Sequence, residues 1–244
     1  MAASEFTRLS IVIPAYNEER FIADLLGKVL AVDLSGFGLE REVIVVDDGS
    51  RDRTAAIVAG IAGVSLYRLE RNAGKGAAVR AGIARATGDL LIIQDADLEY
   101  EPADYVPMIA ELVRSGAGAV YGSRYLSADG GGTKRPGQSW AAYLGGRSLS
   151  LVQWLFTGQY LSDTVTALKL FRSPVIKSMT LQTTGFELDH EITSKVLGGG
   201  HTIREVPIRY YPRSREEGKK IGARDWFIAV RTYARYGRKG SATH

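Results

Sequence analysis

The chain has 244 residues, 45% of them hydrophobic and 24% charged, and it contains no cysteine. This composition is typical of a globular protein with one large domain or two small ones. The lack of cysteine excludes disulfides and zinc–thiolate sites and favours a cytoplasmic setting, and we find neither a secretory signal nor an apolar run of about 18 residues that would span a bilayer.

The first half of the chain alternates the patterns of strands and helices. Short apolar runs predict buried strands, and apolar residues spaced three and four apart predict helices. The predicted strands are 9–14, 42–48, 64–69, 89–94 and 117–123, and the predicted helices are 18–32, 53–62, 74–86 and 102–116. This alternation implies right-handed crossovers and a mostly parallel α/β sheet, in which ligands bind beyond the carboxyl ends of the strands. The segments "DDGS" (47–50), "QDADLE" (94–99) and "GSRY" (122–125) lie at those ends.

The second half is less regular. Its Gly-rich segment at 127–137 predicts a mobile loop. The other predicted elements are a long helix at 138–161, a strand at 164–171, a helix at 189–199, a strand at 203–211 and an amphipathic helix at 223–237. Because we find no internal repeat and no linker, we expect residues 1–244 to form a single domain with two halves, 9–125 and 126–244.

The net charge of +4 is unevenly distributed along the chain. Residues 201–240 hold eleven Lys and Arg against four Asp and Glu, a net charge of +7, so the rest of the chain is net negative. A basic segment of this kind fits an anionic partner such as a phosphate, a lipid headgroup or nucleic acid, although a solvated surface fits the charge equally well.

The sequence lacks the motifs of several common binding and catalytic sites. The sequence has no G-x-G-x-x-G after a strand, and "NAGKGAA" (72–78) lacks the spacing of a phosphate-binding P-loop. It has no G-x-S-x-G, and its three histidines show no metal-ligand spacing. Without an aromatic stacking ribbon or a helix-turn-helix pattern, a nucleic-acid partner is not expected.

Asp95 and Asp97 follow directly after a buried strand, separated by one residue. Two carboxylates this close are costly to ionise together unless a cation lies between them. Oxygen ligands suit Mg²⁺ or Mn²⁺, and such an ion would neutralise the diphosphate leaving group of an activated substrate. The alternative is a turn with solvated acids, so the surrounding motifs have to decide.

Those motifs resemble a known family. In order they are "IVIPAYNEE" (11–19), "VVDDGSRDRT" (45–54), "RNAGKGAAVRAG" (71–82), "GDLLIIQDADLEY" (88–100) and "YGSRY" (121–125). Together they resemble the inverting glycosyltransferases of family two with the GT-A fold. The later segments "SDTVTALKLF" (162–171), "GFELDHEI" (185–192) and "EVPIRYYPRSREEGKKIG" (205–222) resemble the branch that includes dolichyl-phosphate mannosyltransferase and dolichyl-phosphate glucosyltransferase. The resemblance covers about residues 9–225.

The resemblance implies roles for particular residues. Those implied to bind the nucleotide sugar are Pro14, Tyr16, Glu18, Val46, Asp48, Gly74, Lys75, Asp95, Ala96, Asp97, Arg124, Arg213 and Lys219. Asp48 is implied to accept a hydrogen bond from the base, while Asp47 orders the turn. The residues implied to act in catalysis are Asp97, Arg124, Arg213 and Lys219, the last three by reaching phosphates.

The metal ligands implied for Mg²⁺ or Mn²⁺ are Asp95, Asp97 and Glu99, although Glu99 stands where the mannosyl branch often has Gln. Structural alternatives stay open for the basic residues. Arg124 could pair with a carboxylate, and Arg213 and Lys219 could belong to a solvated loop.

The segment 139–161 bears on the acceptor. It combines Trp140, Trp154, Leu155 and other apolar residues with nearby Arg and Lys, as an interfacial helix does. A helix packed on the sheet explains the same pattern equally well. With the basic C-terminal helix, the pattern favours a protein on the cytoplasmic face of a membrane, and the resemblance implies a polyprenyl-phosphate acceptor for the second half of the chain.

The predicted function is therefore inverting transfer of a hexose from a nucleotide diphospho-sugar, such as GDP-mannose or UDP-glucose, to a polyprenyl or dolichyl phosphate. A glycosyltransferase with a soluble or glycan hydroxyl acceptor is the alternative enzyme. A non-catalytic nucleotide-sugar sensor and a glycoside hydrolase with two acids are rivals of other classes, and the hydrolase would not need the "DDGS" segment. The sequence does not determine the sugar, the nucleotide or the oligomeric state.

Overall fold

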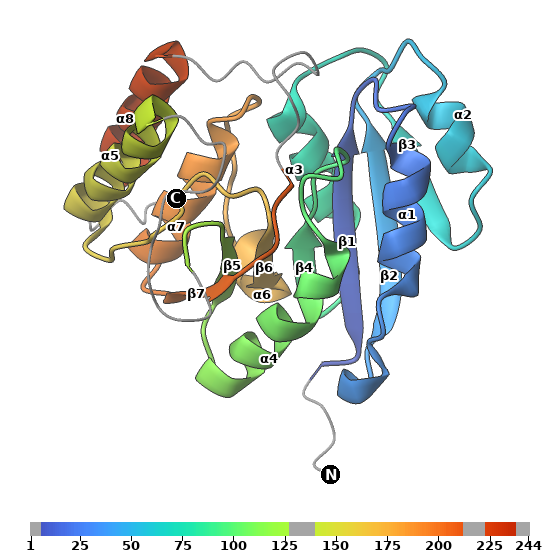
Figure 1. Cartoon of the computed structure of the whole chain (residues 1–244), viewed down its shortest axis with the longest axis horizontal. Helices are drawn as coiled ribbons and strands as arrows, with labels where there is room; N and C mark the ends of the chain where they lie inside the picture. The colour runs from blue at the N-terminus through green and yellow to red at the C-terminus, as the bar shows by residue number, and fades with distance from the viewer. Residues whose placement is uncertain (1–5, 127–139, 212–222, 238–244) are drawn as a thin grey trace.

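The structure, a computed structural model, describes residues 6–126, 140–211 and 223–237 (Figure 1). Its strands are β1 Arg8–Ala15, β2 Glu40–Asp47, β3 Val64–Arg68, β4 Leu90–Ile93, β5 Ala119–Ser123, β6 Lys169–Arg172 and β7 Ile203–Pro207. Its α-helices are α1 Ile22–Ala31, α2 Thr54–Ala59, α3 Lys75–Arg85, α4 Tyr105–Ser115, α5 Trp140–Thr157, α6 Ser173–Lys177, α7 Leu188–Gly198 and α8 Ala223–Tyr236. Short 3-10 helices lie at Ser35–Phe37 and Pro102–Asp104.

The strands form one sheet in the order β3-β2-β1-β4-β6-β5-β7. Neighbouring strands are parallel except β6, which is antiparallel to both β4 and β5. The prediction of a mostly parallel α/β sheet is confirmed. The carboxyl ends of β1, β2, β4 and β5 therefore meet at one edge of the sheet, where the predicted site residues follow them.

Helices cover both faces of the sheet because successive strand residues point to opposite sides. Leu9, Ile11 and Ile13 of β1 pack in one cluster with the buried residues of α1 and α4. Val12 belongs to the opposite cluster, which includes buried residues of α3, α6 and α7. The helices α5 and α8 pack on each other and on α7, and so form an outer layer at one end of the molecule (Figure 1). None of the described helices is both long and apolar enough to cross a membrane.

The predicted helix at 138–161 and the two strands of the second half are shorter in the structure. The helix ends at Thr157, because Gly158 adopts the left-handed conformation with φ +81°, and its predicted start lies outside the described residues. The predicted strand 203–211 ends at Pro207, opposite the last residue of β5. The predicted loop at 127–137 also lies outside the described residues.

The predicted strand 164–171 is mostly irregular, and only its end belongs to β6 Lys169–Arg172. In place of a strand ladder, the backbone N–H of Ala167 donates to the Tyr100 hydroxyl, and the carbonyl of Thr166 accepts from the Lys169 ammonium. The short helix α6 has no counterpart in the prediction. It begins with Ser173 and Pro174, and proline is favoured in the first turn of a helix.

Gly82 lets α3 pack closely on β1. A Cβ atom at this position would lie 2.3 Å from Cγ1 of Val12, which is far inside van der Waals contact. Lys75 is the first residue of α3, so the contact between Gly82 and Val12 also affects how far Lys75 lies from the sheet. The packing at Gly82, near the carboxyl end of α3, therefore helps to position Lys75 at the amino end.

We expect Gly82→Ala to lower the free energy of unfolding by about 1–3 kcal/mol, because Val12 or the helix has to shift. The matched control is Gly27→Ala in α1, where a Cβ meets nothing within 4 Å. That change should raise stability by about 0.5–1 kcal/mol, since alanine is the better helix former. Urea denaturation of both variants checks this, and equal effects of the two changes would contradict the packing argument.

Candidate functional site

The turn after β2 is organised by two adjacent carboxylates. The Asp47 side chain is fully buried, accepts from the backbone N–H of Ser50 at 3.1 Å and pairs with Arg68 at 3.0 Å. The two carboxylate oxygens of Asp48 accept from the backbone N–H groups of Ala73 at 2.8 Å and Gly74 at 2.9 Å. Asp47 thus orders the turn as expected. Asp48 holds the loop before α3, and its contact with a base stays a prediction.

The loop after β1 is tied to the same turn. Pro14 and Val46 are register partners in the paired strands β1 and β2, and both are buried. The backbone N–H of Glu18 donates to the Thr54 hydroxyl at 2.8 Å, whereas the Tyr16 side chain is exposed. The structure therefore brings these four residues, which the resemblance implies to bind the nucleotide sugar, together at the carboxyl edge of β1 and β2.

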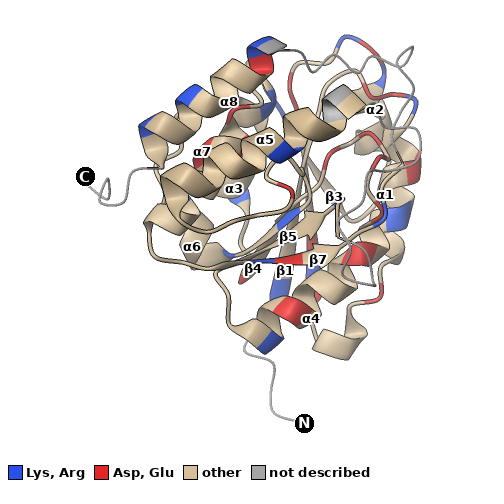
Figure 2. Ribbon diagram, turned by 60° about the vertical axis from the view of Figure 1, so that its left-hand side comes forward, with Lys and Arg blue, Asp and Glu red and all other residues tan. Residues whose placement is uncertain are grey.

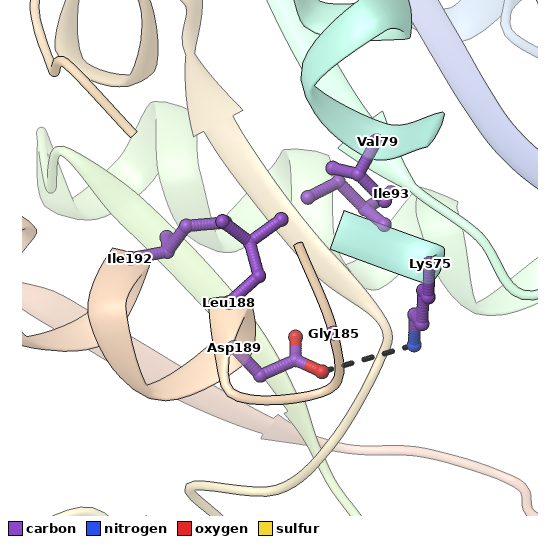
Figure 3. Close-up of a pocket in the computed structure, with 7 residues that line it drawn as sticks. All are labelled: Lys75, Val79, Ile93, Gly185, Leu188, Asp189 and Ile192. Atoms are coloured by element: carbon purple, nitrogen blue, oxygen red, sulfur yellow. Dashed lines mark ion pairs between the residues drawn. The ribbon is translucent and has the colours of Figure 1, made fainter. Parts of the chain in front are cut away.

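Four alternating charges connect the end of β4 with α7. The Lys75 ammonium lies 2.7 Å from one oxygen of Asp95 and 3.7 Å from Asp189. The other Asp189 oxygen lies 2.6 Å from the ammonium of Lys169, whose side chain is fully buried. Figure 3 shows Lys75 and Asp189 facing each other across a narrow pocket, lined further by Val79, Ile93, Gly185, Leu188 and Ile192.

The pKa values in this cluster follow from burial and from the neighbouring charges. Burial acts to lower the pKa of Lys75, but Asp95 and Asp189 outweigh it and raise that pKa above its ordinary value. Burial acts to raise the pKa of Asp189, and the two lysines outweigh it and lower that pKa. For Lys169 burial prevails, and its pKa lies below the usual value. Opposite charges thus keep Lys75 and Asp189 ionised at neutral pH.

The loop before α7 packs on the amino end of α3. A Cβ at Gly74, which has φ +97°, would lie 2.4 Å from the carbonyl oxygen of Thr184, and one at Gly76 would lie 2.7 Å from the Thr184 carbonyl carbon. Glu191 holds this loop by accepting from the backbone N–H groups of Gln182 and Thr183. Both glycines are therefore needed for the close approach of the two segments.

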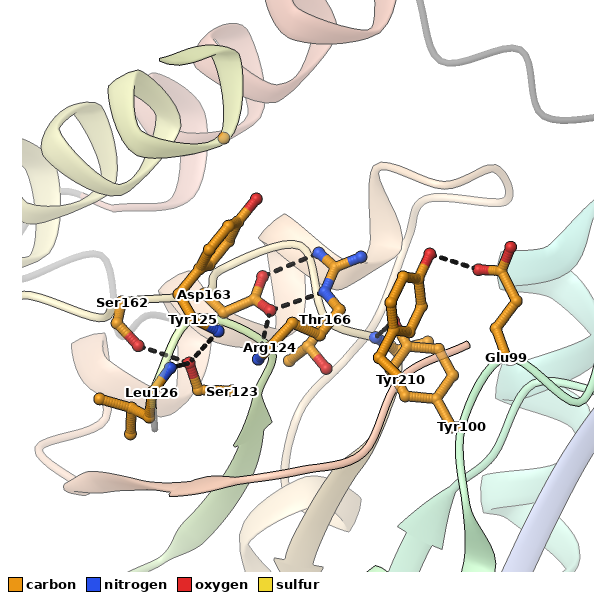
Figure 4. Close-up of polar contacts among 12 residues, drawn as sticks. Glu99, Tyr100, Ser123, Arg124, Tyr125, Leu126, Ser162, Asp163, Thr166 and Tyr210 are labelled. Atoms are coloured by element: carbon orange, nitrogen blue, oxygen red, sulfur yellow. Dashed lines mark hydrogen bonds and ion pairs between the residues drawn. The ribbon is translucent and has the colours of Figure 1, made fainter. Parts of the chain in front are cut away.

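A second group of contacts joins the predicted metal motif after β4 to the segment that follows β7 (Figure 4). The Tyr210 hydroxyl donates to the Glu99 carboxylate at 2.6 Å, and the backbone N–H of Tyr211 donates to the Glu99 carbonyl. Asp97 accepts from the backbone N–H of Glu99 at 3.1 Å. Ala96, between the two aspartates, is buried. The Glu99 side chain, predicted as a third metal ligand, is thus bonded to a tyrosine.

Arg124 is bound to a carboxylate that the sequence analysis did not identify. Its Nε and one terminal nitrogen donate to the two oxygens of Asp163 at 2.7 and 2.8 Å, and its guanidinium lies 5.1 Å from the ring centre of Tyr210. The Asp163 side chain is fully buried, and this pair raises the pKa of Arg124 well above its usual value against the effect of burial. The structural alternative for Arg124 is therefore observed, and its phosphate contact stays a prediction.

The carboxylates of "GFELDHE" are also engaged. Asp189 is bonded to Lys169, Glu191 to Lys195 at 2.5 Å, and Glu187 accepts from the backbone N–H of Gly185. Structural pairing, rather than exposure as a base, is thus the observed state of these groups. The remaining predicted phosphate ligands, Arg213 and Lys219, lie outside the described residues.

The residues at the end of β4 fit a divalent ion. Asp95 and Asp97 are partly exposed and present carboxylate oxygens at the edge of the sheet, and a cation, the Lys75 ammonium, already contacts Asp95. No group of three or more His, Cys, Asp or Glu side chains that could hold a metal occurs among the described residues. The two carboxylates Asp95 and Asp97 nevertheless suit Mg²⁺ or Mn²⁺. These ions are often bound by one or two carboxylates and complete their coordination with substrate phosphates.

A family model described as glycosyl transferase family 2 matches residues 10–179. The chain belongs to glycosyl transferase family 2. It is 30% identical over 225 residues to a dolichol-phosphate mannosyltransferase of Pyrococcus furiosus, covering 88% of this chain and 60% of the relative. It is 37% identical over 179 residues to a dodecaprenyl-phosphate galacturonate synthase of Rhizobium johnstonii, covering 71% of this chain and 50% of the relative. The family 2 chain thus spans about half to three-fifths of the length of these relatives.

The fold of this family 2 chain is also found in solved structures. One is glucosyl-3-phosphoglycerate synthase of Mycobacterium tuberculosis, in complex with Mn²⁺, UDP and glucosyl-3-phosphoglycerate. The TM-score is 0.69 with 18% sequence identity, over 97% of this chain and 82% of the other. The likeness confirms the predicted GT-A fold.

Glu99 gives a test of the metal motif. We expect Glu99→Gln to change the affinity for Mn²⁺ with nucleotide by less than about threefold, because an amide oxygen still accepts from Tyr210. The matched control is Asp97→Asn, the same chemical change two residues away, which should weaken binding by about tenfold or more through the loss of a charged ligand. Isothermal titration calorimetry measures both. An equal loss in the two variants would instead identify Glu99 as a ligand.

Proposed function

We propose that this family 2 protein transfers a hexose from a nucleotide diphospho-sugar to a polyprenyl phosphate, with inversion at the anomeric carbon and with Mg²⁺ or Mn²⁺. The observation that carries the proposal is the meeting of three segments at one sheet edge. They are the turn at Asp48, the amino end of α3 at Lys75, and the pair Asp95 and Asp97 after β4. A nucleoside, a diphosphate and a metal ion need such neighbouring sites.

The divalent ion would be held by Asp95 and Asp97 and would supply positive charge to the diphosphate leaving group. The chain's own groups position the donor. Tyr16 is exposed beside the turn and can contact the nucleoside, and Asp48 keeps the N–H groups of the loop before α3 in a fixed arrangement. Arg124 and Lys75 add positive charge near the same edge, and Arg213 and Lys219 would add more from the segment after Tyr211.

A phosphate acceptor would require no general base in the site. A phosphate monoester with a second pKa of about 6 is largely a dianion at neutral pH and is itself the nucleophile. The carboxylates nearest to the acceptor half support this, since Asp189 and Glu191 are paired with lysines. A sugar hydroxyl would instead require a positioned general base.

The similarities leave the donor open. One relative is named for mannose and another for galacturonate, while both names contain a polyprenyl-type phosphate. This pattern supports the acceptor class more than any one sugar. We therefore propose a GDP- or UDP-linked hexose and identify it by screening, since a true donor stabilises the protein by mass action.

The outer helices α5 and α8 support a place on a membrane surface. Their exposed apolar residues are Trp140, Leu144, Leu151, Trp154, Leu155 and Phe227. On α5 the first three and Leu155 are spaced by four, seven and four residues, which puts them on one face of the helix. Basic residues line α8 on the outside of the molecule (Figure 2). Exposed apolar residues on α5 and exposed basic residues on the adjoining α8 fit anionic headgroups, and we propose that this layer rests on the cytoplasmic face of a membrane.

The first experiment measures transfer of labelled sugar from GDP- and UDP-hexoses to polyprenyl phosphate. We expect turnover with Mn²⁺ or Mg²⁺ that excess chelator and Asp97→Ala both abolish. The value of kcat/KM should rise through about pH 6 and then level off, because it follows ionisation of the acceptor phosphate. Turnover in excess chelator would reject the metal, faster transfer to a soluble hydroxyl acceptor would favour the alternative enzyme, and donor binding without turnover would favour a sensor.

The second experiment measures binding to vesicles of anionic phospholipid. We expect the double change Leu151→Glu and Leu155→Glu, at positions 53% and 73% exposed, to weaken binding by about tenfold or more. The double change Val106→Glu and Val113→Glu is the matched control, because these residues are 37% and 53% exposed on α4, against the opposite face of the sheet. Wild-type binding should fall with rising salt. Equal binding by all three proteins would remove the membrane surface from the proposal.

A further inference from the structure

The positive charge of Lys75 is in an unfavourable position unless an anion lies beside it. It is the first residue of α3, where the helix dipole presents its positive end and disfavours a further positive charge. Its side chain is only 17% exposed, so it has also lost most of its contact with water. The two carboxylates beside it compensate for this, at 2.7 Å for Asp95 and 3.7 Å for Asp189.

The two partners of Lys75 differ in what else they contact. Asp189 is bound on its other oxygen by the buried ammonium of Lys169 at 2.6 Å. Asp95, by contrast, is a predicted ligand of the divalent ion, and both of its oxygens lie within 2.9 Å of the Lys75 ammonium. The Lys75 ammonium thus contacts the same oxygens of Asp95 that would bind the divalent ion.

An ammonium and a divalent cation repel each other strongly at the distance of a shared carboxylate. A divalent ion on Asp95 therefore has to displace the ammonium, and Asp189 is placed to receive it. A movement of about 1 Å toward Asp189 would bring Lys75 within hydrogen-bond distance of that carboxylate. The four-carbon stem of a lysine allows such a movement without a change in the backbone. The ring of Phe186, which precedes α7, lies 5.7 Å from the ammonium and offers a further contact.

We propose that Lys75 is the internal counter-ion of the metal site: it neutralises Asp95 in the metal-free protein and moves to Asp189 when the divalent ion binds. Lys75 is then a positioning residue. Its positive charge offsets the repulsion between the Asp95 and Asp97 carboxylates before the nucleotide sugar binds. After the movement, the main contact of the Lys75 ammonium is with Asp189 of α7, which belongs to the second half of the chain. The inference rests on the metal site of the proposed function.

The test is the affinity of the whole chain for Mn²⁺, followed by the electron paramagnetic resonance signal of the free ion. Lys75→Met removes the competing charge and keeps an unbranched side chain that suits a helix, so Mn²⁺ should bind about tenfold more tightly than to the wild type. Lys75→Arg restores a cation and should bring the affinity back toward the wild-type value. Melting temperature without metal should fall in Lys75→Met, because Asp95 loses its partner.

The matched control is Arg85→Met, which removes one positive charge from the other end of the same helix. Arg85 is exposed and lies roughly 15 Å along the helix from Lys75, beyond the Debye length of about 8 Å at physiological salt. Its affinity for Mn²⁺ should stay within about twofold of the wild-type value.

The outcomes separate this inference from the proposed function. If the wild type binds Mn²⁺ and Lys75→Met, measured without nucleotide, binds it no more tightly, the counter-ion role is wrong while the metal site stands. If neither protein binds Mn²⁺ with UDP or GDP present, the metal site itself is wrong. Tighter binding in Lys75→Met that Lys75→Arg reverses, with Arg85→Met unchanged, supports the role of Lys75.

Discussion

The architecture of the site depends on compensating the carboxylates that converge at one edge of the sheet. Parallel strands bring their carboxyl ends together, and in this chain aspartates lie at or close after the ends of β2 and β4, while Asp163 comes from the segment before β6. Each observed partner is different. Asp48 is met by two backbone N–H groups, Asp95 by an ammonium and Asp163 by a guanidinium. Because removing one member of a buried pair leaves an uncompensated charge, these contacts help to fix the loops at the edge of the sheet.

The compensation also distinguishes the two halves of the site. On the donor side, Asp48 takes its hydrogen bonds from the backbone, so the loop before α3 has a fixed shape before any ligand binds. At the ends of β4 and β5, the partners are the long side chains of Lys75 and Arg124, which can exchange one anion for another. A nucleotide can thus meet a preformed surface, whereas phosphates can be met by groups that change partners.

Much of the fold was predictable because it follows from local patterns. Strands and helices in the first half have clear apolar periodicity, and the motifs after β2 and β4 identify the edge at which ligands would bind. The irregular segment 164–168 was predicted as part of a strand because its alternation of Thr and apolar residues has the period of a strand. The buried hydrogen bonds that replace the strand ladder there come from Tyr100 and Lys169, and no local pattern reveals them.

The partners within the site were the least predictable part. Asp163 lies 39 residues from Arg124, and Asp189 lies more than a hundred residues from Lys75, so neither pair leaves a periodic signal. The motif "GFELDHE" contains three carboxylates, but only the fold shows that Asp189 faces two lysines. The basic residues Arg213 and Lys219 remain predictions from the sequence.

The position of β6 has a consequence for how the chain is made. β6 comes after β5 in the sequence but lies between β4 and β5 in the sheet. During synthesis, β4 therefore has β1 on one side and lacks its other native partner until roughly 75 more residues have been added. At a translation rate of about 5–20 residues per second this interval is on the order of 4–15 s. For that time an apolar strand presents an unpaired edge, which is the condition under which strands associate with foreign chains.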